Sequence, residues 1–160
     1  MATKKQSESS SSRSRVKLEF GWREWIELPD FGITGVKAKI DTGARTSALH
    51  ALNLHSIRRN GKPWARFDVQ PLQKKNSATV RCEAPVIDHR EVRNSGGQVE
   101  HRVVIETTIA IGGEAWPIEV TLTNRSDMRF RMLLGRTALR GRGLVNPSRS
   151  FVSSKAPAGV

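Results

Sequence analysis

The 160-residue sequence predicts an all-β protein, folded as a closed β-barrel with one short helix. Short stretches in which apolar and polar residues alternate follow one another between residues 22 and 123, as expected for half-buried strands. Strong turn signals, Asn60-Gly61 and Gly112-Gly113, separate two pairs of these stretches. Only residues 136–140 have a helical pattern, and glycines soon end it. Many short strands joined by tight turns favour a barrel or a sandwich.

The expected strands come in a regular order along the chain. They are residues 22–28, 35–40, 54–59, 63–69, 78–82, 86–92, 99–111 and 114–123. The Asn-Gly turn joins the third strand to the fourth and the Gly-Gly turn joins the last two, so both pairs are predicted to be hairpins. The second strand leads directly into Asp41-Thr42-Gly43 and presents that tripeptide at its end.

Residues 16–150 are expected to form one folded domain, long enough for a single hydrophobic core. Residues 1–15 are rich in serine and charge and are expected to be disordered. The small residues, proline and glycine of residues 151–160 predict a flexible C-terminal tail.

The chain is strongly basic, with a formal net charge of +12 at pH 7. Residues 1–15 contain four basic residues and one glutamate, so +9 of this charge lies in the rest of the chain. A basic folded body predicts an acidic partner, such as nucleic acid, the ribosome, an anionic lipid or an acidic peptide. The alternative is a solvated surface that only keeps the protein soluble.

Cys82 is the only cysteine, so no intrachain disulfide can form, as is typical of a reducing compartment. A small buried strand position is its expected place. No apolar run reaches the roughly 18 residues of a membrane helix. The first 15 residues also lack the apolar core of a signal peptide. We therefore expect a cytoplasmic protein without a membrane partner.

Asp41-Thr42-Gly43 is the motif that carries the most chemistry. Asp41 supplies a carboxylate, Thr42 a hydroxyl that can tie down the loop, and Gly43 a tight turn where a side chain would clash. The tripeptide also makes ordinary turns. A second signal lies downstream in residues 132–139, where two aliphatic residues and a glycine precede a short helix. The order and separation of the two signals suit one small barrel.

These motifs resemble the retropepsin-like peptidases and, more closely, the RimB family, which is often labelled an ATP-dependent zinc protease. The matching segments, which together span roughly residues 18–150, are residues 24–29, 39–51, 88–90 and 133–136. The resemblance implies the acid protease fold and an aspartic endopeptidase. It also implies that Asp41, Thr42 and Gly43 form the catalytic loop.

Aspartic peptidases use two carboxylates that share one proton and hold a water molecule between them. This chain has a single Asp-Thr-Gly and no Asp-Ser-Gly. The second carboxylate is therefore expected from another copy of the chain, in a two-fold homodimer with Asp41 on the axis. Ala44 has no hydroxyl that could stabilise an ionised carboxylate, which favours activity nearer neutral pH.

The family link also implies a substrate. RimB-like proteins are associated with RimK, an ATP-grasp ligase that adds glutamates to the C-terminus of a small-subunit ribosomal protein. Guanidinium groups bind carboxylates bidentately, which suits a glutamate-rich peptide. The candidate substrate-binding residues are Ala44, Arg45, Arg125, Arg129, Arg131 and Arg136. For Arg136 the alternative is an internally paired structural arginine.

A flap over the cleft is expected somewhere in residues 57–105, because the segment between the two signature loops is longer than a minimal retropepsin needs. Its tip would lie at residues 74–77 or 94–98, although both could be ordinary surface loops. Asp88, Arg90, Glu100 and Arg102 are expected to form cross-strand ion pairs. The alternative is that these charges line a specificity pocket.

No cofactor or metal is expected. The chain has no Gly-rich phosphate loop ending in Gly-Lys-Ser or Gly-Lys-Thr, and no His-Glu-x-x-His. His50 and His55 are five residues apart, which matches no usual zinc pair. An ATP requirement would more sensibly describe the ligase partner.

Two other functions stay open. One is a catalytically inert retropepsin-like module that binds the RimK ligase or the ribosome. The other is a basic RNA-binding protein, whose binding would be sensitive to salt. The four tryptophans are expected in the core or at the dimer interface rather than as stacking platforms for bases, because they are not interleaved with basic residues.

Overall fold

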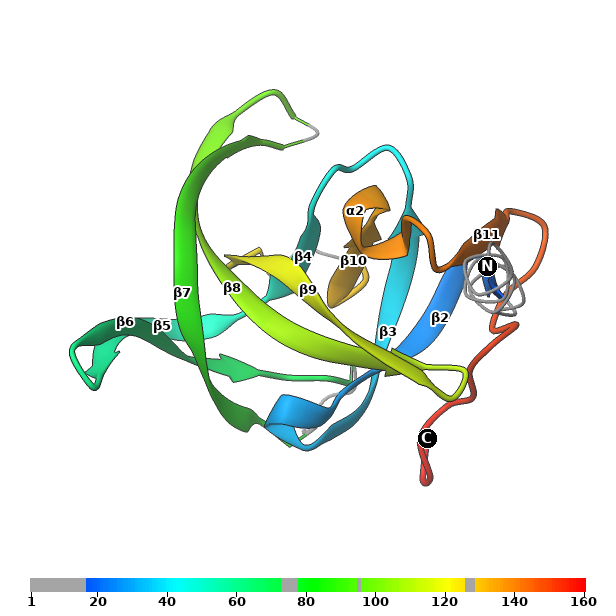
Figure 1. Cartoon of the computed structure of the whole chain (residues 1–160), viewed down its shortest axis with the longest axis horizontal. Coiled ribbons are helices and arrows are strands. Elements are labelled where there is room, and N and C mark those ends of the chain that lie inside the picture. The colour runs from blue at the N-terminus through cyan, green and yellow to red at the C-terminus, as the bar shows by residue number, and fades with distance from the viewer. Residues whose placement is uncertain (1–16, 73–77, 95, 126–128) are drawn as a thin grey trace, which may run out of the picture.

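The computed structural model describes residues 17–72, 78–94, 96–125 and 129–160, which are mostly β-strand (Figure 1). The strands are β1 (Leu18–Gly21), β2 (Arg23–Leu28), β3 (Ile33–Asp41), β4 (Ser47–His50), β5 (Leu52–Arg59), β6 (Lys62–Val69), β7 (Val80–Arg93), β8 (Val99–Ile111), β9 (Glu114–Thr123), β10 (Met132–Gly135) and β11 (Gly143–Asn146). A 3-10 turn, η1 (Pro29–Phe31), follows β2. Within these residues the only α-helix is the short α2 (Arg136–Leu139).

Most of the described strands belong to one sheet, in the order β2-β3-β10-β4-β9-β8-β7-β6-β5. β2 also pairs with β8, where Glu27 lies opposite Ala110, so the strands from β2 to β8 close into a barrel. Strands β5, β6 and β7 continue past this closure, and we call them the β5–β7 ribbon (Figure 1). The prediction of an all-β closed barrel with one short helix is confirmed.

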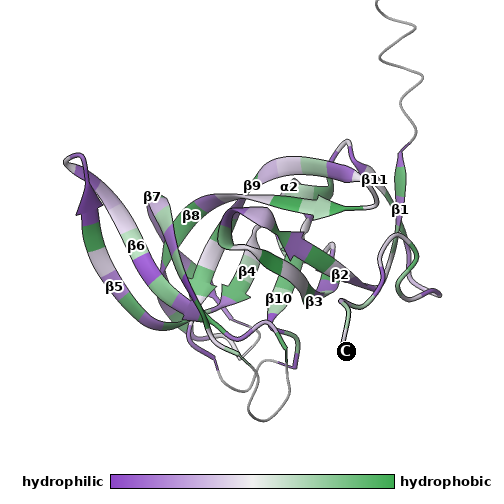
Figure 2. Ribbon diagram, turned by 90° about the horizontal axis from the view of Figure 1, so that it is seen from below, coloured by the Kyte–Doolittle hydropathy of each residue, from purple (hydrophilic) through white to green (hydrophobic). Residues whose placement is uncertain are grey.

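The barrel encloses a continuous hydrophobic core. Phe20, Ile26, Leu49, Ile105 and Leu134 are fully buried and come from five different strands. Because successive side chains of a strand point to opposite faces, alternating sequences place one set inside. Figure 2 shows this alternation of hydrophilic and hydrophobic residues along the β5–β7 ribbon. Each fully buried aliphatic or aromatic side chain contributes about 1.5–3 kcal/mol of burial free energy.

The expected strands are present, but two of them are continuous. Residues 78–82 and 86–92 contribute to the single strand β7, which runs through Pro85. Pro85 lies opposite Trp64 of β6, and the pairing with β8 shifts register between Val86 and Asp88. The prediction of two separate strands is wrong because a bulge, rather than a break, interrupts the pattern here.

Four short strands, β1, β4, β10 and β11, were not expected. β1 and β11 pair in parallel as a separate two-stranded sheet that joins the two ends of the domain. All four residues of β4 are buried, so the strand has no alternation that could reveal it. β4 and β10 pair with each other and flank the loop after Asp41.

The chain beyond residue 150 has no regular secondary structure, but its first residues contact β2. The backbone N–H groups of Val152 and Ser153 donate to Glu24, at 2.9 and 3.3 Å. The Ser154 hydroxyl donates to the same carboxylate, at 2.6 Å. Phe151 stacks on Trp25 with ring centroids 6.2 Å apart. These contacts continue the folded domain past residue 150, where a flexible tail was expected to begin.

Two further sequence predictions concern buried residues. Cys82 lies in the core on β7, as expected, and burial raises the pKa of its thiol to about 12, with a smaller contribution from the charge of Asp68. The thiol is therefore protonated at neutral pH and is a poor nucleophile. Trp116 is also in the core and donates its Nε1–H to the carbonyl of Ala138 at 2.9 Å.

No helix in the described part of the chain is long and apolar enough to span a bilayer.

Candidate active site

The position of Asp41 follows from how three strands are paired. β10 lies between β3 and β4, parallel to β3 and antiparallel to β4, with Gly135 opposite Asp41. Residues 42–46 connect β3 to β4 and must therefore pass around the end of β10 (Figure 1). The two sequence motifs, which are distant in the chain, are brought together by this arrangement.

Backbone hydrogen bonds fasten this loop to the start of α2. The N–H of Arg136 donates to the carbonyl of Ala44 at 2.9 Å, and the N–H of Thr137 donates to the carbonyl of Arg45 at 3.1 Å. The Thr137 hydroxyl donates to the same Arg45 carbonyl at 2.8 Å. One residue earlier, the N–H of Gly135 donates to Ser47 Oγ at 3.0 Å in a buried contact. The start of α2 thus binds the carbonyls of Ala44 and Arg45, and Gly135 binds Ser47, just after the loop.

Gly135 is the glycine that this arrangement requires. A Cβ atom at this position would lie 2.8 Å from the carbonyl carbon of Thr46 and 3.0 Å from the oxygen of Ala44, and both are backbone atoms. Gly43 was expected to be needed for a tight turn, but it does not have a positive φ angle. Its Cβ would meet only Asp41 Oδ1, at 3.2 Å, and its N–H donates to that oxygen at 3.1 Å. The role of Gly43 is therefore close approach to the carboxylate.

Asp41 is half-buried at the edge of a pocket of about 370 Å³. The residues that line this pocket, which we call the Asp41 pocket, are Trp22, Lys39, Asp41, Ala48, Arg102, Thr123, Arg125, Arg129, Phe130 and Leu133. Among these lining residues Asp41 is the only carboxylate, whereas four are cations. Trp22 and Phe130 meet edge to face, with ring centroids 5.9 Å apart, and give the pocket an aromatic wall.

The structure brings some of the predicted substrate-binding residues to Asp41 but not others. Arg125 and Arg129 line the Asp41 pocket. Arg45, Arg131 and Arg136 are not among its lining residues. Arg136 instead donates from Nη1 to the carbonyl of Gly43 at 3.3 Å, which agrees with the structural alternative considered for it.

The remaining predicted residues act through their backbone or face solvent. The N–H of Ala44 donates to the Asp41 carbonyl at 3.2 Å and closes the turn. Thr42 is exposed, and within the described residues its hydroxyl has no hydrogen-bond partner. The carbonyl of Arg131 accepts a hydrogen bond from the N–H of His50 at 2.8 Å. Arg131 Nε is buried without a partner among the described atoms.

Two cations of the pocket were not among the predicted binding residues. Lys39 precedes Asp41 by two residues on β3, so the period of two places both side chains on one face. That signal was available in the sequence. Arg102 lies on β8, 61 positions away from Asp41, and reaches the pocket because β8 and β9 pair next to β4. No local pattern could have revealed this proximity.

The expected cross-strand ion pairs among Asp88, Arg90, Glu100 and Arg102 are wrong, whereas the alternative of a pocket-lining charge agrees with the position of Arg102. Asp88 pairs with Arg90 and Glu100 pairs with Arg102, each two residues along the same strand. Arg90 also reaches across β8 to Glu119 of β9, at 3.0 Å. The hydrogen bond from Arg90, followed by one from the His89 N–H, lowers the pKa of Asp88. Side chains on one face of a strand repeat every two residues, which explains the pairing within each strand.

A second, more polar hollow of about 590 Å³ adjoins the Asp41 pocket. It is lined by Asn94, Gly96, Gln98, Val99, Glu100, Asn124 and Arg125, and Arg125 also lines the Asp41 pocket. Residues 94–98 connect β7 to β8, and the Asn94 N–H donates to the Gln98 carbonyl at 2.9 Å. Of the two candidate flap tips, the second therefore borders this hollow through its described residues Asn94, Gly96 and Gln98. Residues 74–77 lie outside the described residues.

Comparisons with known proteins agree with this geometry. The family model of the retropepsin-like aspartic endopeptidase RimB, termed RimB-like, matches residues 19–156. The chain belongs to the RimB-like family. A crystal structure of a protein of unknown function from Legionella pneumophila has the same fold as this RimB-like chain, with a TM-score of 0.74 and 30% identity. The match covers 86% of this chain and 98% of that protein.

Curated relatives of this RimB-like chain carry the name of a ligase. A probable alpha-L-glutamate ligase from Shewanella halifaxensis is 46% identical over 135 residues, which are 84% of this chain and 30% of the ligase. One from Parasynechococcus marenigrum is 48% identical over 134 residues, or 84% of this chain and 29% of that protein. The chain therefore spans less than a third of the length of these relatives.

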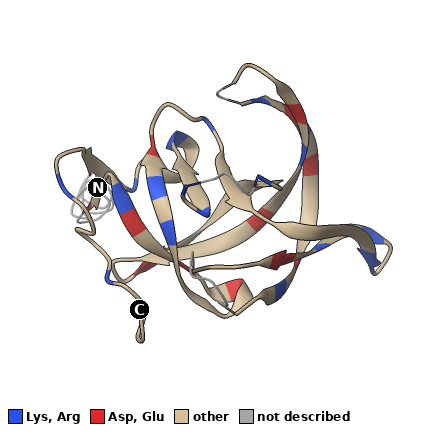
Figure 3. Cartoon of the chain, turned by 180° about the vertical axis from the view of Figure 1, so that it is seen from behind, with Lys and Arg blue, Asp and Glu red and all other residues tan. Residues whose placement is uncertain are grey.

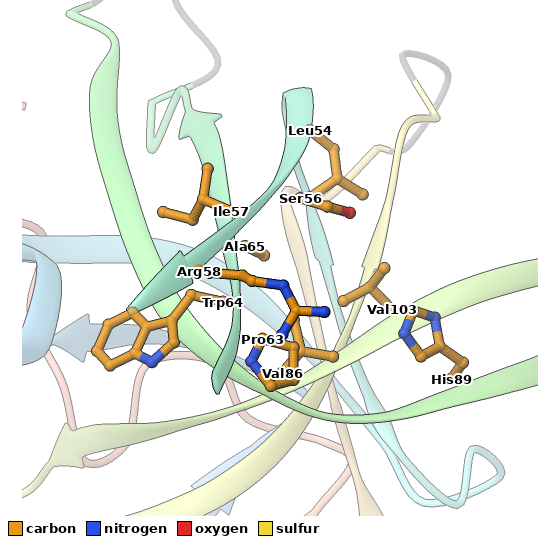
Figure 4. Close-up of a pocket in the computed structure, with 10 residues that line it drawn as sticks. All are labelled: Leu54, Ser56, Ile57, Arg58, Pro63, Trp64, Ala65, Val86, His89 and Val103. Carbon is orange, nitrogen blue, oxygen red and sulfur yellow. The ribbon is translucent and has the colours of Figure 1, made fainter. Parts of the chain in front are cut away.

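A third pocket of this RimB-like chain, of about 300 Å³, lies on the β5–β7 ribbon and differs in character (Figure 4). Apolar side chains such as Leu54, Ile57, Val86 and Val103 line it, and Arg58 is its one arginine or lysine. No carboxylate is among its lining residues. In the part of the chain that the structure describes, no three His, Cys, Asp or Glu side chains gather in a way that could hold a metal ion.

Proposed function

We propose that this chain is an aspartic endopeptidase that hydrolyses peptide bonds in an acidic, glutamate-rich substrate. The observation that carries the proposal is the Asp41 pocket, where the carboxylate of the Asp-Thr-Gly loop faces the same space as Lys39, Arg102, Arg125 and Arg129. Cations in a partly enclosed site attract carboxylates and discriminate against neutral peptides. A family described as aspartic endopeptidases supports the same reaction class.

The mechanism requires a second carboxylate, for which we propose a two-fold homodimer. Each copy contributes Asp41, and the two carboxylates share one proton and hold a water molecule between them. One carboxylate takes a proton from the water as it attacks the scissile carbonyl, while the other donates its proton to the carbonyl oxygen. The tetrahedral intermediate then collapses as its C–N bond breaks: the leaving nitrogen takes up a proton from the dyad, and a hydroxyl of the intermediate returns a proton to it. Thr42 and Gly43 are exposed in one chain and accessible to a second copy.

For the substrate we propose the polyglutamate tail that a RimK-type ligase adds to a small-subunit ribosomal protein, in the cytoplasm. Relatives named as probable alpha-L-glutamate ligases support this choice, because they link the domain to glutamate chemistry. The cations of the Asp41 pocket supply the matching charge. Arg45 would add a cation outside the pocket, since it is an exposed residue of the loop and is not one of the lining residues.

The test is mass spectrometry of a peptide with a glutamate tail, incubated with wild-type protein, Asp41→Asn and Asp88→Asn. Asp88 is a matched control because it is an exposed aspartate in an ion pair outside the pocket. Wild type and Asp88→Asn should shorten the tail, and Asp41→Asn should leave it intact, with at least about a thousandfold loss of rate. Equal cleavage by wild type and Asp41→Asn would refute the proposal.

The dimer is tested by mixing. Adding an excess of Asp41→Asn protein to a fixed amount of wild type should lower the activity, because wild-type chains would be drawn into inactive mixed dimers. An excess of a double variant, Asp41→Asn with Asp88→Asn, should inhibit to the same extent. Activity that is unchanged by the excess would show that one chain acts alone.

A second candidate function is a non-catalytic module that binds a glutamate ligase. It is favoured by one observation, that relatives of this chain occupy less than a third of longer proteins named as ligases. This candidate predicts complex formation with a separate ligase chain that Asp41→Asn does not weaken. If neither cleavage nor ligase binding is detected, RNA binding in low salt is the remaining candidate to measure.

A further inference from the structure

We propose that Arg102 determines the specificity of the Asp41 pocket for glutamate, and that Glu100 is the built-in counter-ion with which a substrate carboxylate competes. The inference rests on the proposed peptidase function and names one residue pair that sets its substrate class.

Arg102 differs from an ordinary surface arginine in its burial. The residue is 6% exposed, yet its side chain lines the Asp41 pocket. Arginine is rarely buried to this extent unless its charge is paired, since desolvating a guanidinium is costly. The position therefore places a fixed positive charge in the wall of the pocket.

The hydrogen bonds of Arg102 explain how it is held. Its Nε and Nη2 donate to Glu100 Oε2 at 3.2 and 3.0 Å, and Nη1 donates to the Thr121 hydroxyl at 3.3 Å. A guanidinium has five N–H donors. The described residues accept from three of them, which leaves one N–H on each terminal nitrogen without an acceptor among these residues. A side chain that is already immobilised loses little entropy when it binds.

Glu100 is itself positioned by a second contact. Its Oε1 accepts a hydrogen bond from the Thr123 hydroxyl at 2.8 Å, and its side chain is 30% exposed. Glu100 lines the hollow next to the 94–98 turn, whereas Arg102 lines the Asp41 pocket, so the ion pair forms part of the boundary between the two spaces. A peptide that extends from Asp41 toward that turn would pass this pair.

Glu100 presents to Arg102 the same chemical group that a substrate glutamate would present. Two carboxylates beside one guanidinium repel each other, so Glu100 lowers the affinity of the pocket for an acidic side chain. Replacing Glu100 with glutamine keeps a hydrogen-bond acceptor near Arg102 but removes the competing charge. This substitution should tighten the binding of a glutamate peptide.

The experiment measures binding in full-length protein that carries Asp41→Asn, so that no peptide is cleaved. Fluorescence anisotropy would give the Kd of two labelled peptides, one with a tail of four glutamates and one with four glutamines. Arg102→Gln should raise the Kd of the glutamate peptide at least tenfold and change the Kd of the glutamine peptide less than twofold. Glu100→Gln should lower the Kd of the glutamate peptide severalfold.

The matched control is Arg58→Gln, which removes a cation from the third pocket and should leave both Kd values unchanged. A folded Arg102→Gln variant with the same preference for glutamate as its parent would overturn the proposal. If Arg102→Gln does not fold, Glu100→Gln decides, and an unchanged Kd for the glutamate peptide overturns the proposal. If Arg102→Gln weakens binding of the glutamate peptide but the wild type cleaves no peptide, the role of Arg102 stands and only the peptidase function is contradicted.

Discussion

The loop after Asp41 and the β5–β7 ribbon both reach solvent, but they differ in their use of charged side chains. Backbone groups of α2 and β10 fasten the loop, through Arg136, Thr137 and Gly135. The strands of the ribbon pair through their backbones, and ion pairs add to this pairing, with Glu83 bound to both Arg59 and Arg66. Figure 3 shows the basic residues at the tip of its β5–β6 hairpin.

This difference has a functional meaning. Backbone hydrogen bonds to α2 fix the geometry of the Asp41 loop without an ion pair. The Asp41 carboxylate accepts one hydrogen bond, from the Gly43 N–H, and forms no ion pair within the described residues. In the ribbon, by contrast, acidic residues neutralise nearby arginines. The Asp41 carboxylate is thus not neutralised by an ion pair and can take part in catalysis, whereas Glu83 and Asp68 form ion pairs that stabilise the ribbon.

The comparison is tested most strongly by adding one methyl group to each region. Gly135→Ala forces a Cβ against backbone atoms of Thr46 and Ala44, which cannot move without shifting the loop, and should cost about 3 kcal/mol. At Gly61, in the hairpin tip, an added Cβ meets no other atom, but the backbone has a positive φ angle of +74°. Gly61→Ala should therefore lower the free energy of unfolding by about 1 kcal/mol. Urea unfolding midpoints measure both. Equal losses would show that the loop is less tightly packed than its contacts indicate.

A second comparison uses one residue type in two places. Glu24 is fully buried and accepts hydrogen bonds from Gly21, Val152, Ser153 and Ser154. In Glu24→Gln an amide NH₂ would face some of these donors, which should cost about 2 kcal/mol.

The matched variant, Glu83→Gln, removes the ion pairs with Arg59 and Arg66, whose side chains are partly exposed to solvent. Its loss of stability should be much smaller, because water screens exposed charges. Both variants would be measured by urea unfolding in the same buffer. A larger loss of stability for Glu83→Gln than for Glu24→Gln would contradict the expectation that the buried carboxylate contributes more.

The sequence predicted the features of the fold that have a local signal and missed those set by the order of strands in the sheet. Both hairpins and the strand that presents Asp41 were predictable, because alternation and turn residues are local signals. β4 was not, since Ser47–His50 is buried throughout and lacks a period of two. The pairing of α2 with the loop could only be expected from the resemblance, which names both motifs. Arg102 was considered only as one of four charges that could line a pocket, because sheet order, rather than chain distance, places it beside Asp41.

The smallest expected effect concerns the pH dependence of the ribbon. The hydrogen bond from Asn53, and to a lesser extent the interaction with Arg81, lowers the pKa of Asp68 in the folded protein. A carboxyl whose pKa is lower in the folded state stabilises the protein above its unfolded pKa, about 3.9, and loses this contribution as the pH falls through the folded value. The stability difference between wild type and Asp68→Asn should therefore be largest near pH 7 and shrink below about pH 4.

Asn53→Ala sharpens this prediction, because it removes the first cause of the shift but leaves the carboxyl in place. In that background the effect of Asp68→Asn on stability should be smaller at pH 7 and should change less on acidification. Urea midpoints of wild type, the two single variants and the double variant at about pH 7, 5 and 3 form a complete cycle. If Asn53→Ala leaves the pH dependence unchanged, the charge of Arg81 rather than the amide of Asn53 holds Asp68. In that case an ion pair would be the main side-chain interaction that holds Asp68, which makes the contrast with the Asp41 loop sharper still.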